Sequence, residues 1–314
     1  MRTTKRSRIS RSVLCTALIL TSLSAGVGGA DAASKEKKPK PGDVSTLPAD
    51  AAVSSGGEVT LPGVQEGAEL GFSGSEGSAP QPESTESIIG ADQRVQVTGT
   101  TTYPARAVGL ITRNGNHHCT GWLISKDTVL TAGHCVHSGA GGSFFSGLRF
   151  FPGRNGTTSP YGSCTPRSGG LTTFVGWSRD GNEQHDAGII KLSCTVGNTT
   201  GWFGFWWQSA SLDGASTQIQ GYPGDKPQTQ WRSNDFVRAT ETYQVFYNND
   251  TVGGMSGSPV WQNRAAGSSF CAGVCGMAIH AYGLHGSGNH AVSNHGTRNT
   301  SAKVDVYLSI RNAA

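Results

Sequence analysis

From Ser87 to its end, the chain alternates short apolar runs with clusters of Gly, Asn, Asp and Pro. This alternation is typical of β-strands separated by turns. The runs are 108–111, 121–124, 128–131, 187–192, 217–220 and 277–279. Few stretches have a helical period, and the best of them, 302–310, predicts a terminal helix. A region of 314 − 86 = 228 residues is long enough for two packed barrels, so we expect an all-β, two-barrel fold with a C-terminal helix.

The first 32 residues have the features of an export signal. Basic residues between Arg2 and Arg11 precede an apolar stretch, 13–25, that is too short to cross a bilayer. An A-x-A cleavage sequence ends at Ala32. We therefore predict a signal peptide over 1–32 and a secreted, extracellular protein that does not associate with membranes.

Six cysteines remain once Cys15 is lost with the signal, and an even number on an exported chain predicts three disulfides. Zinc is the alternative, but the chain has no CxxC pair. A Cys119–Cys135 bridge would close a hairpin and contribute about 3 kcal/mol of stability. Cys271 and Cys275 would tie a short loop, which leaves Cys164 and Cys194 to pair with each other.

Residues 33–86 differ in composition from everything after them. They hold 4 Lys and Arg against 9 Asp and Glu, a net charge of −5, whereas residues 87–314 hold 16 against 11, a net charge of +5. The segment is rich in Pro, Gly and Ser and lacks Trp, Tyr and Cys, so it buries little apolar surface. A disordered linker is one interpretation. Position and composition favour the other, an acidic, largely disordered pro-segment that contacts a mature domain over 87–314.

A serine surrounded by glycines is the strongest local signal, in the sequence Gly-Gly-Met-Ser-Gly-Ser-Pro over 253–259. A hydroxyl becomes a good nucleophile only when a base takes its proton. Glycines allow a tight turn that points successive backbone N–H groups at one spot. We expect Ser256 to be a nucleophile, with the N–H groups of Gly254 and Ser256 forming an oxyanion hole. By itself the sequence also fits a plain turn between strands.

Two further segments supply the partners that such a serine needs. His134 follows an apolar run and precedes Cys135, a context that can fix an imidazole at the edge of a barrel. Asp186 enters the apolar run 187–192, where a buried carboxylate needs a partner. Its useful partner is the imidazole that it can orient. Asp180, in a polar run, is the weaker candidate.

The order His134, Asp186, Ser256, with separations of 52 and 70 residues, is that of the chymotrypsin arrangement. The segments 131–135, 186–190 and 254–259 resemble the trypsin-like serine proteases. Finer features resemble the bacterial glutamyl endopeptidases: Gly-Tyr-Pro-Gly-Asp-Lys-Pro over 221–227, Thr-Val-Gly-Gly-Met-Ser-Gly-Ser-Pro over 251–259, and the segments 87–90, 152–156, 271–275 and 278–280. The resemblance covers 87–314. It implies a chymotrypsin-like fold and a serine endopeptidase that needs no cofactor.

The resemblance also implies a preference for cleavage after Glu, and more weakly after Asp. His280 and Thr251 would contact the substrate carboxylate, and the new N-terminus at Ser87 would lie near the same pocket. Animal trypsin-like enzymes carry an Asp immediately before the nucleophile, where this chain has Met255. Activation therefore cannot use the ion pair that this Asp forms in those enzymes. His280 could also be an ordinary strand histidine.

Asp250 supports a competing specificity, because an Asp six residues before the nucleophile binds Lys or Arg in trypsin-like enzymes. A mature start at Ser87 requires a cut after Glu86, which a Glu-specific enzyme could make itself. The expected partners are protein or peptide substrates and the chain's own pro-segment. A rival hypothesis of another class is a catalytically silent binding or toxin-like module on the same fold.

The remaining features have plainer interpretations. We expect the aromatic run 202–207 to pack between the barrels. His285, His290 and His295 are spaced by five residues, which fits neither one strand face nor a tight ligand motif, so we expect surface loops and no metal. A net charge of +5 on 87–314 is too mild to indicate nucleic-acid binding. A monomer is expected.

Overall fold

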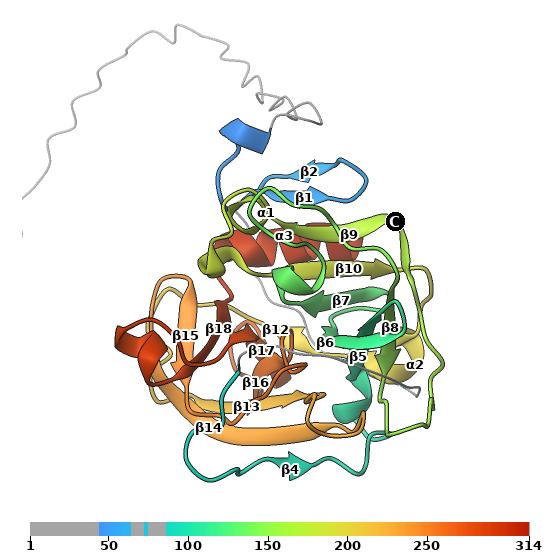
Figure 1. Cartoon of the computed structure of the whole chain (residues 1–314), viewed down its shortest axis with the longest axis vertical. Helices are drawn as coiled ribbons and strands as arrows, with labels where there is room; N and C mark the ends of the chain where they lie inside the picture. The colour runs from blue at the N-terminus through green and yellow to red at the C-terminus, as the bar shows by residue number, and fades with distance from the viewer. Residues whose placement is uncertain (1–43, 64–71, 75–85, 314) are drawn as a thin grey trace, which may run out of the picture. The chain divides into compact units, whose positions relative to one another are not determined.

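The computed structural model describes residues 44–63, 72–74 and 86–313. Its core consists of two sheets, one above the other in the view of Figure 1, whose strands pair antiparallel except for the parallel pair β12 (Gly204–Phe205) and β17 (Gly273–Tyr282). The first has the strand order β2 (Val59–Thr60), β1 (Ala52–Ser54), β9 (Pro166–Phe174), β10 (Gly188–Leu192), β7 (Thr128–Thr131), β6 (Asn116–Leu123), β5 (Val108–Arg113), β8 (Leu148–Pro152). Five of its strands are buried over most of their length, which explains the apolar runs of the sequence.

The second sheet closes into a barrel because β18 pairs with both β15 and β17. Its strand order is β12 (Gly204–Phe205), β17 (Gly273–Tyr282), β16 (Pro259–Arg264), β13 (Ser216–Gly221), β14 (Trp231–Thr240), β15 (Gln244–Tyr247), β18 (Asn294–Arg298). The short strand β4 (Val95–Gln96) pairs with β14. The fold is therefore the two-barrel, trypsin-like one that the sequence predicts, and each predicted apolar run overlaps one of these strands.

Helices are few and short, apart from one at the end of the chain. The short ones are η1 (Val44–Thr46), η2 (Ala105–Ala107), η3 (Gly133–Cys135), α1 (Val175–Ser178), η4 (Glu183–His185), α2 (Gly197–Thr200) and η5 (Gly288–Ala291). The C-terminal helix α3 (Ser301–Asn312) covers the predicted span 302–310. It is capped by Thr300, whose side chain accepts a hydrogen bond from the Lys303 N–H.

The aromatic run 202–207 packs between the barrels, as the sequence predicts. Phe203 is fully buried and meets Trp122 of β6 and Trp261 of β16 edge to face, with ring centroids 5.4 and 5.7 Å apart. The ring of Phe205 meets that of Tyr307 from α3. These contacts join the two barrels and the terminal helix in one apolar core.

The segment preceding the predicted mature domain is more ordered than its composition suggests. Strand β1 extends the first sheet by pairing with β9, with Ala52 opposite Phe174, and β1 and β2 form a hairpin. Strand β3 (Phe72–Gly74) pairs with β11 (Gly201–Trp202). The expectation of a largely disordered segment therefore does not hold for 44–63, because a ready-made sheet edge supplies the partners that the segment lacks by itself.

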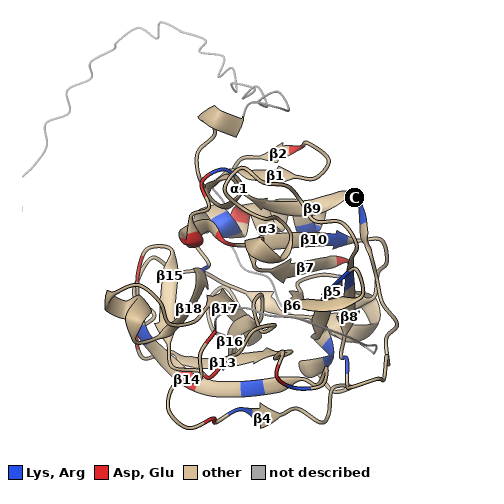
Figure 2. Ribbon diagram, in the orientation of Figure 1, with Lys and Arg blue, Asp and Glu red and all other residues tan. Residues whose placement is uncertain are grey.

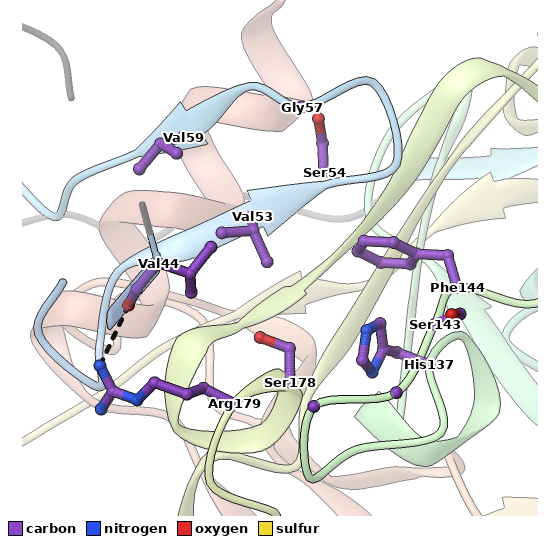
Figure 3. A pocket seen from close by; sticks show the side chains of 12 residues that line it. Val44, Val53, Ser54, Gly57, Val59, His137, Ser143, Phe144, Ser178 and Arg179 are labelled. Atoms are coloured by element: carbon purple, nitrogen blue, oxygen red, sulfur yellow. Dashed lines mark hydrogen bonds between the residues drawn. The ribbon is translucent and has the colours of Figure 1, made fainter. Parts of the chain in front are cut away.

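Side chains of the domain hold this segment in place. The Arg179 guanidinium donates hydrogen bonds to the carbonyl oxygens of Val44, Ser45 and Leu47, at 3.2, 3.2 and 2.8 Å. Leu47 is buried against Val175 and neighbouring apolar side chains. Figure 3 shows the pocket between this segment and the loops of the first barrel, with the Arg179–Val44 bond drawn.

Three disulfides join Cys119 to Cys135, Cys164 to Cys194 and Cys271 to Cys275, the same pairs that the spacing suggests. Lys and Arg residues are scattered over the strands of both sheets, with Asp and Glu among them (Figure 2). The predicted signal peptide, 1–32, lies outside the described residues.

Candidate active site

His134 lies on the single turn η3, directly after strand β7. Its backbone N–H donates to Oδ1 of Asp186, and its ring Nδ1 donates to Oδ2 of the same carboxylate, each at 2.7 Å. This two-point contact fixes both the position and the tautomer of the imidazole, which leaves the Nε2 lone pair facing away from the carboxylate. His134 Nε2 is buried and has no hydrogen-bond partner in the part of the chain that the structure describes.

Asp186 is completely buried directly after η4, two residues before β10 begins. Besides His134, its Oδ2 accepts a short hydrogen bond from the Tyr282 hydroxyl. Its backbone carbonyl accepts a hydrogen bond from Thr297 Oγ1 at 2.8 Å. A buried carboxylate with this many donors is held in one orientation. Asp180, the weaker candidate, pairs instead with the neighbouring Arg179.

The environment raises the pKa of His134 above its usual value. Burial is the largest single effect and would lower this pKa, but the charge and hydrogen bond of Asp186, together with the charges of Glu86 and Glu183, outweigh it. Three carboxylates thus favour the imidazolium form of His134.

Ser256 lies in the turn between β15 and β16, on the side of the second barrel. Its carbonyl accepts a hydrogen bond from the Thr120 N–H of the first barrel at 2.8 Å. Gly254 has a φ of +98°, and an added Cβ would lie 2.5 Å from Nε2 of His117, so only glycine fits. The Gly253 carbonyl accepts from the Gly224 N–H, which turns the Gly254 N–H of the same trans peptide to the opposite side.

The carboxylate of Glu86 occupies the space beside the serine. Ser256 Oγ donates a short hydrogen bond to Glu86 Oε1, and the same oxygen lies 3.5 Å from Nε2 of His280. The Glu86 side chain is completely buried. The residue before the predicted cleavage point therefore has its side chain between the candidate nucleophile and the candidate specificity residue.

His280 is fully buried in β17, and burial lowers its pKa to about 3. At neutral pH it is therefore a neutral hydrogen-bond donor. Its Nε2 faces the carboxylate of Glu86, which can only accept, so the proton belongs on Nε2. Its Nδ1 then accepts from the Tyr247 hydroxyl at 2.9 Å. The fold thus presents an N–H group to a carboxylate without burying a charged imidazole.

Ser87 and Thr251 lie next to this carboxylate pocket. The Ser87 carbonyl accepts from the Thr251 N–H at 3.3 Å and from Nδ2 of Asn294 at 2.6 Å, while the Ser87 N–H donates to Oδ1 of Asn294 at 3.2 Å. Thr251 Oγ1 is buried and makes no hydrogen bond with the described residues. Asn294, which the sequence gave no reason to select, holds both backbone groups of Ser87.

Asp250 does not face this pocket as a free carboxylate. It is 2% exposed, and its two oxygens accept hydrogen bonds from the N–H groups of Ile89 and Gln93 at 2.8 and 2.7 Å. Its role in this structure is to hold segment 87–93 against the barrel, so the basis for a Lys or Arg preference is absent.

Tyr282 is a site residue that sequence reasoning missed. Its hydroxyl bonds to Asp186, and its ring lies 5.8 Å from the ring of His134. It is two residues from His280 on one strand, but no motif marks it. Only its contact with Asp186 in the folded chain reveals it.

The three histidines expected in surface loops do not all lie there. His295 is completely buried in β18, His290 is partly buried in η5, and His285 is exposed. Together with Glu183 they form one of two groups of potential metal ligands among the described residues. The other contains His134 with Cys119 and Cys135, but those sulfurs are joined in a disulfide.

Comparisons with known proteins agree with this geometry. Residues 119–267 match the family model described as a trypsin-like peptidase domain. The chain is 44% identical over 207 residues to a glutamyl endopeptidase of Bacillus licheniformis, a match covering 66% of this chain and 64% of that protein. The chain is a glutamyl endopeptidase homologue. A second relative is a Bacillus subtilis protein named extracellular metalloprotease. It is 38% identical to this chain, and the match covers 63% of each protein.

A solved Glu endopeptidase in complex with MPD has the same fold as this glutamyl endopeptidase homologue. The TM-score is 0.63 at 28% identity, and the match covers 72% of this chain and all of that one. The homologue spans slightly less than two thirds of the length of its two curated relatives. In its described part, no helix has the length and apolar character needed to span a bilayer.

Proposed function

We propose that the chain is a secreted serine endopeptidase that hydrolyses peptide bonds after Glu, and more weakly after Asp, through an acyl-enzyme. One observation supports it above all: the Glu86 carboxylate lies against both Ser256 and His280. A pocket that accommodates a buried glutamate beside a candidate nucleophile has the chemistry to select a substrate glutamate.

In the proposed reaction, Ser256 Oγ attacks the scissile carbonyl while His134 Nε2 takes its proton. Asp186 holds the imidazole through Nδ1 and stabilises the imidazolium that forms. The N–H groups of Gly254 and Ser256 would bind the oxyanion. His134 then passes its proton to the leaving amine, and water releases the acyl group by the same steps in reverse order.

The proposed preference for Glu depends on uncharged hydrogen-bond donors and on the positive charge of a new N-terminus. His280 Nε2–H and the Thr251 hydroxyl would donate to the substrate carboxylate. Cleavage after Glu86 would convert the Ser87 amide, now bonded to Asn294, into an ammonium group beside the same pocket. The hydrogen bonds of Asp250 to Ile89 and Gln93 argue against the alternative preference for Lys or Arg.

We further propose that residues 33–86 form a pro-segment, removed after residue 86 to leave the mature domain 87–314. Arg179 holds its residues 44–47, its strand β1 pairs with β9, and its last residue, Glu86, lies against Ser256 and His280. The uncut chain would be a zymogen, because a substrate glutamate and Glu86 cannot share the pocket.

Matched peptides with Glu, Asp, Arg or Phe before the scissile bond test this proposal. We expect kcat/KM for Glu to exceed that for Arg and Phe by roughly 10³-fold or more, because mismatched side chains leave buried donors unpaired. In the mature form, 87–314, a fluorophosphonate should label Ser256 stoichiometrically, and Ser256→Ala should abolish labelling. Ser258→Ala, two residues away, is the control that should retain it. A higher kcat/KM for Arg would refute the specificity, and failure to label Ser256 would favour the silent-module hypothesis.

A further inference from the structure

Four potential metal ligands that the proposed reaction does not use meet beside the candidate active site. Glu183 comes from η4, three residues before Asp186. His285 and His290 come from the connection between β17 and β18, and His295 from β18 itself. Each offers one ligand atom, and these four atoms all lie within 4.8 Å of one another.

The rings and the carboxylate converge closely. Glu183 Oε2 lies 3.1 Å from Nε2 of His285 and 3.7 Å from Nε2 of His295. The ring centroids of His290 and His295 are 4.5 Å apart, and that of His285 is 4.9 and 5.1 Å from these two. Three imidazoles therefore surround one carboxylate.

Both ring nitrogens of His285 face oxygen atoms that can only accept hydrogen bonds. Its Nδ1 lies 3.1 Å from the Gly283 carbonyl, which only accepts, so Nδ1 carries a proton. Its Nε2 faces the carboxylate of Glu183, which also only accepts. Nε2 of His285 and the Glu183 carboxylate oxygen thus face each other 3.1 Å apart, and a metal ion bound by both atoms would likewise hold them close together.

His295 is the buried anchor of the cluster. Its side chain is 0% exposed, and neither ring nitrogen makes a hydrogen bond with any described residue. The ring is stacked between Phe246 and Tyr282, with centroids 5.1 and 5.3 Å away and interplanar angles of 28° and 22°. Burial of an imidazole without hydrogen bonds is costly, whereas a metal bond would satisfy it.

We propose that Glu183, His285, His290 and His295 bind a divalent transition-metal ion of the zinc type. Three imidazoles and one carboxylate form a donor set that suits this ion. Ligand atoms about 2.0–2.1 Å from zinc lie about 3.3 Å apart in a tetrahedron, so the cluster must contract by at most about 1.5 Å. His285 and His290 lie in a surface connection that can make this movement, while His295 is fixed by its stacking.

Equilibrium dialysis of the purified full chain against Zn²⁺, with the metal counted by mass spectrometry, tests the site. The protein carries Ser256→Ala to prevent self-digestion and has no polyhistidine tag. We expect one Zn²⁺ per chain, and visible absorption bands typical of tetrahedral geometry when Co²⁺ replaces it. Glu183→Gln and His290→Gln should each weaken binding by at least about tenfold.

Glu241→Gln is the matched control. Glu241 is a carboxylate that contacts the same connection, through Asn289 Nδ2 at 3.1 Å, but it is not in the cluster. It should bind Zn²⁺ like the parent. Circular dichroism checks that each variant is folded, and the exposed His285→Gln replaces any variant that is not. Absence of stoichiometric Zn²⁺ binding, or binding that both cluster variants retain, would overturn the proposal. Neither result affects the proposed peptidase activity, which the peptide assay tests separately.

Discussion

The hydroxyl of Ser256 donates a hydrogen bond to the carboxylate of Glu86, a residue 170 positions earlier in the chain. The same carboxylate faces His280. One side chain of the preceding segment therefore engages both the candidate nucleophile and the candidate specificity residue. Removal of Glu86 from this position is the step on which activation would depend.

Self-processing is the first prediction. The parent chain should yield a product that begins at Ser87, whereas Ser256→Ala should remain uncut in a protease-free sample. N-terminal sequencing and intact mass measure the product. Ser258→Ala should mature like the parent. Appearance of the Ser87 terminus in purified Ser256→Ala would exclude self-processing.

The second prediction concerns the pKa of His134 in the uncut chain. In the Ser256→Ala background, Glu86→Gln should lower this pKa, because one of the negative charges that raise it is removed. A raised folded-state pKa stabilises the fold below the unfolded value of about 6.5, and this contribution is lost as pH rises through the folded-state pKa. In the uncut chain, Glu86→Gln should therefore reduce the difference between the free energies of unfolding at acidic and at neutral pH. NMR titration of the His134 ring measures the shift, and an unchanged pKa would contradict the contact.

Tyr282→Phe tests the hydroxyl that bonds to Asp186. Loss of a hydrogen bond to a charged group, typically about 1.5–3 kcal/mol, should lower kcat roughly tenfold or more with little change in KM. The acid limb of the kcat profile should move to higher pH, because Asp186 would then attract the His134 proton more strongly. Tyr243→Phe is the control, since its hydroxyl bonds to Asp50 in the preceding segment. Equal kcat in both variants would show that the Tyr282 hydroxyl does not contribute to catalysis.

Gly254→Ala should lower kcat about 10²- to 10³-fold, because the new Cβ meets His117 and Tyr222 and displaces the proposed oxyanion donor. Gly115→Ala separates this effect from backbone strain. Gly115 also has a positive φ, +82°, but an added Cβ there meets nothing within 4 Å. Steady-state kinetics with a Glu peptide would show the difference, and a similar loss in both variants would argue against an oxyanion role.

Metal binding should appear in thermal unfolding. At a free Zn²⁺ concentration 100 times its dissociation constant, binding raises the free energy of unfolding by about 2.7 kcal/mol. Tm should therefore rise by roughly 5–10 °C. A chelator should reverse the rise, and Glu183→Gln should lack it. Scanning calorimetry with Ser256→Ala provides the measurement. A rise of equal size in Glu183→Gln would place the ion elsewhere.

The sequence predicted the fold because apolar runs, turn residues and three spaced motifs agreed with one another. It selected His134, Asp186 and Ser256 as candidates from their local context, and in the structure the first two are in direct contact. It could not reveal Tyr282, because the pairing of β17 with β18 and its approach to Asp186 are long-range features. The five-residue spacing of the histidines fits no single element, because His285 and His290 lie in the connection between β17 and β18 whereas His295 lies on β18 itself, and the fold brings the three together.

Strand β1 pairs with β9 opposite Thr172, Thr173 and Phe174, and among the described residues no other strand pairs with that side of β9. Removal of residues 33–86 would make residues 172–174 of β9 part of an edge strand, with backbone N–H and C=O groups that β1 no longer pairs. Such a strand is a template on which another extended polypeptide can be added. Activation would therefore open the catalytic pocket and at the same time expose an edge strand. At high concentration, the mature protein would then self-associate more readily than its precursor.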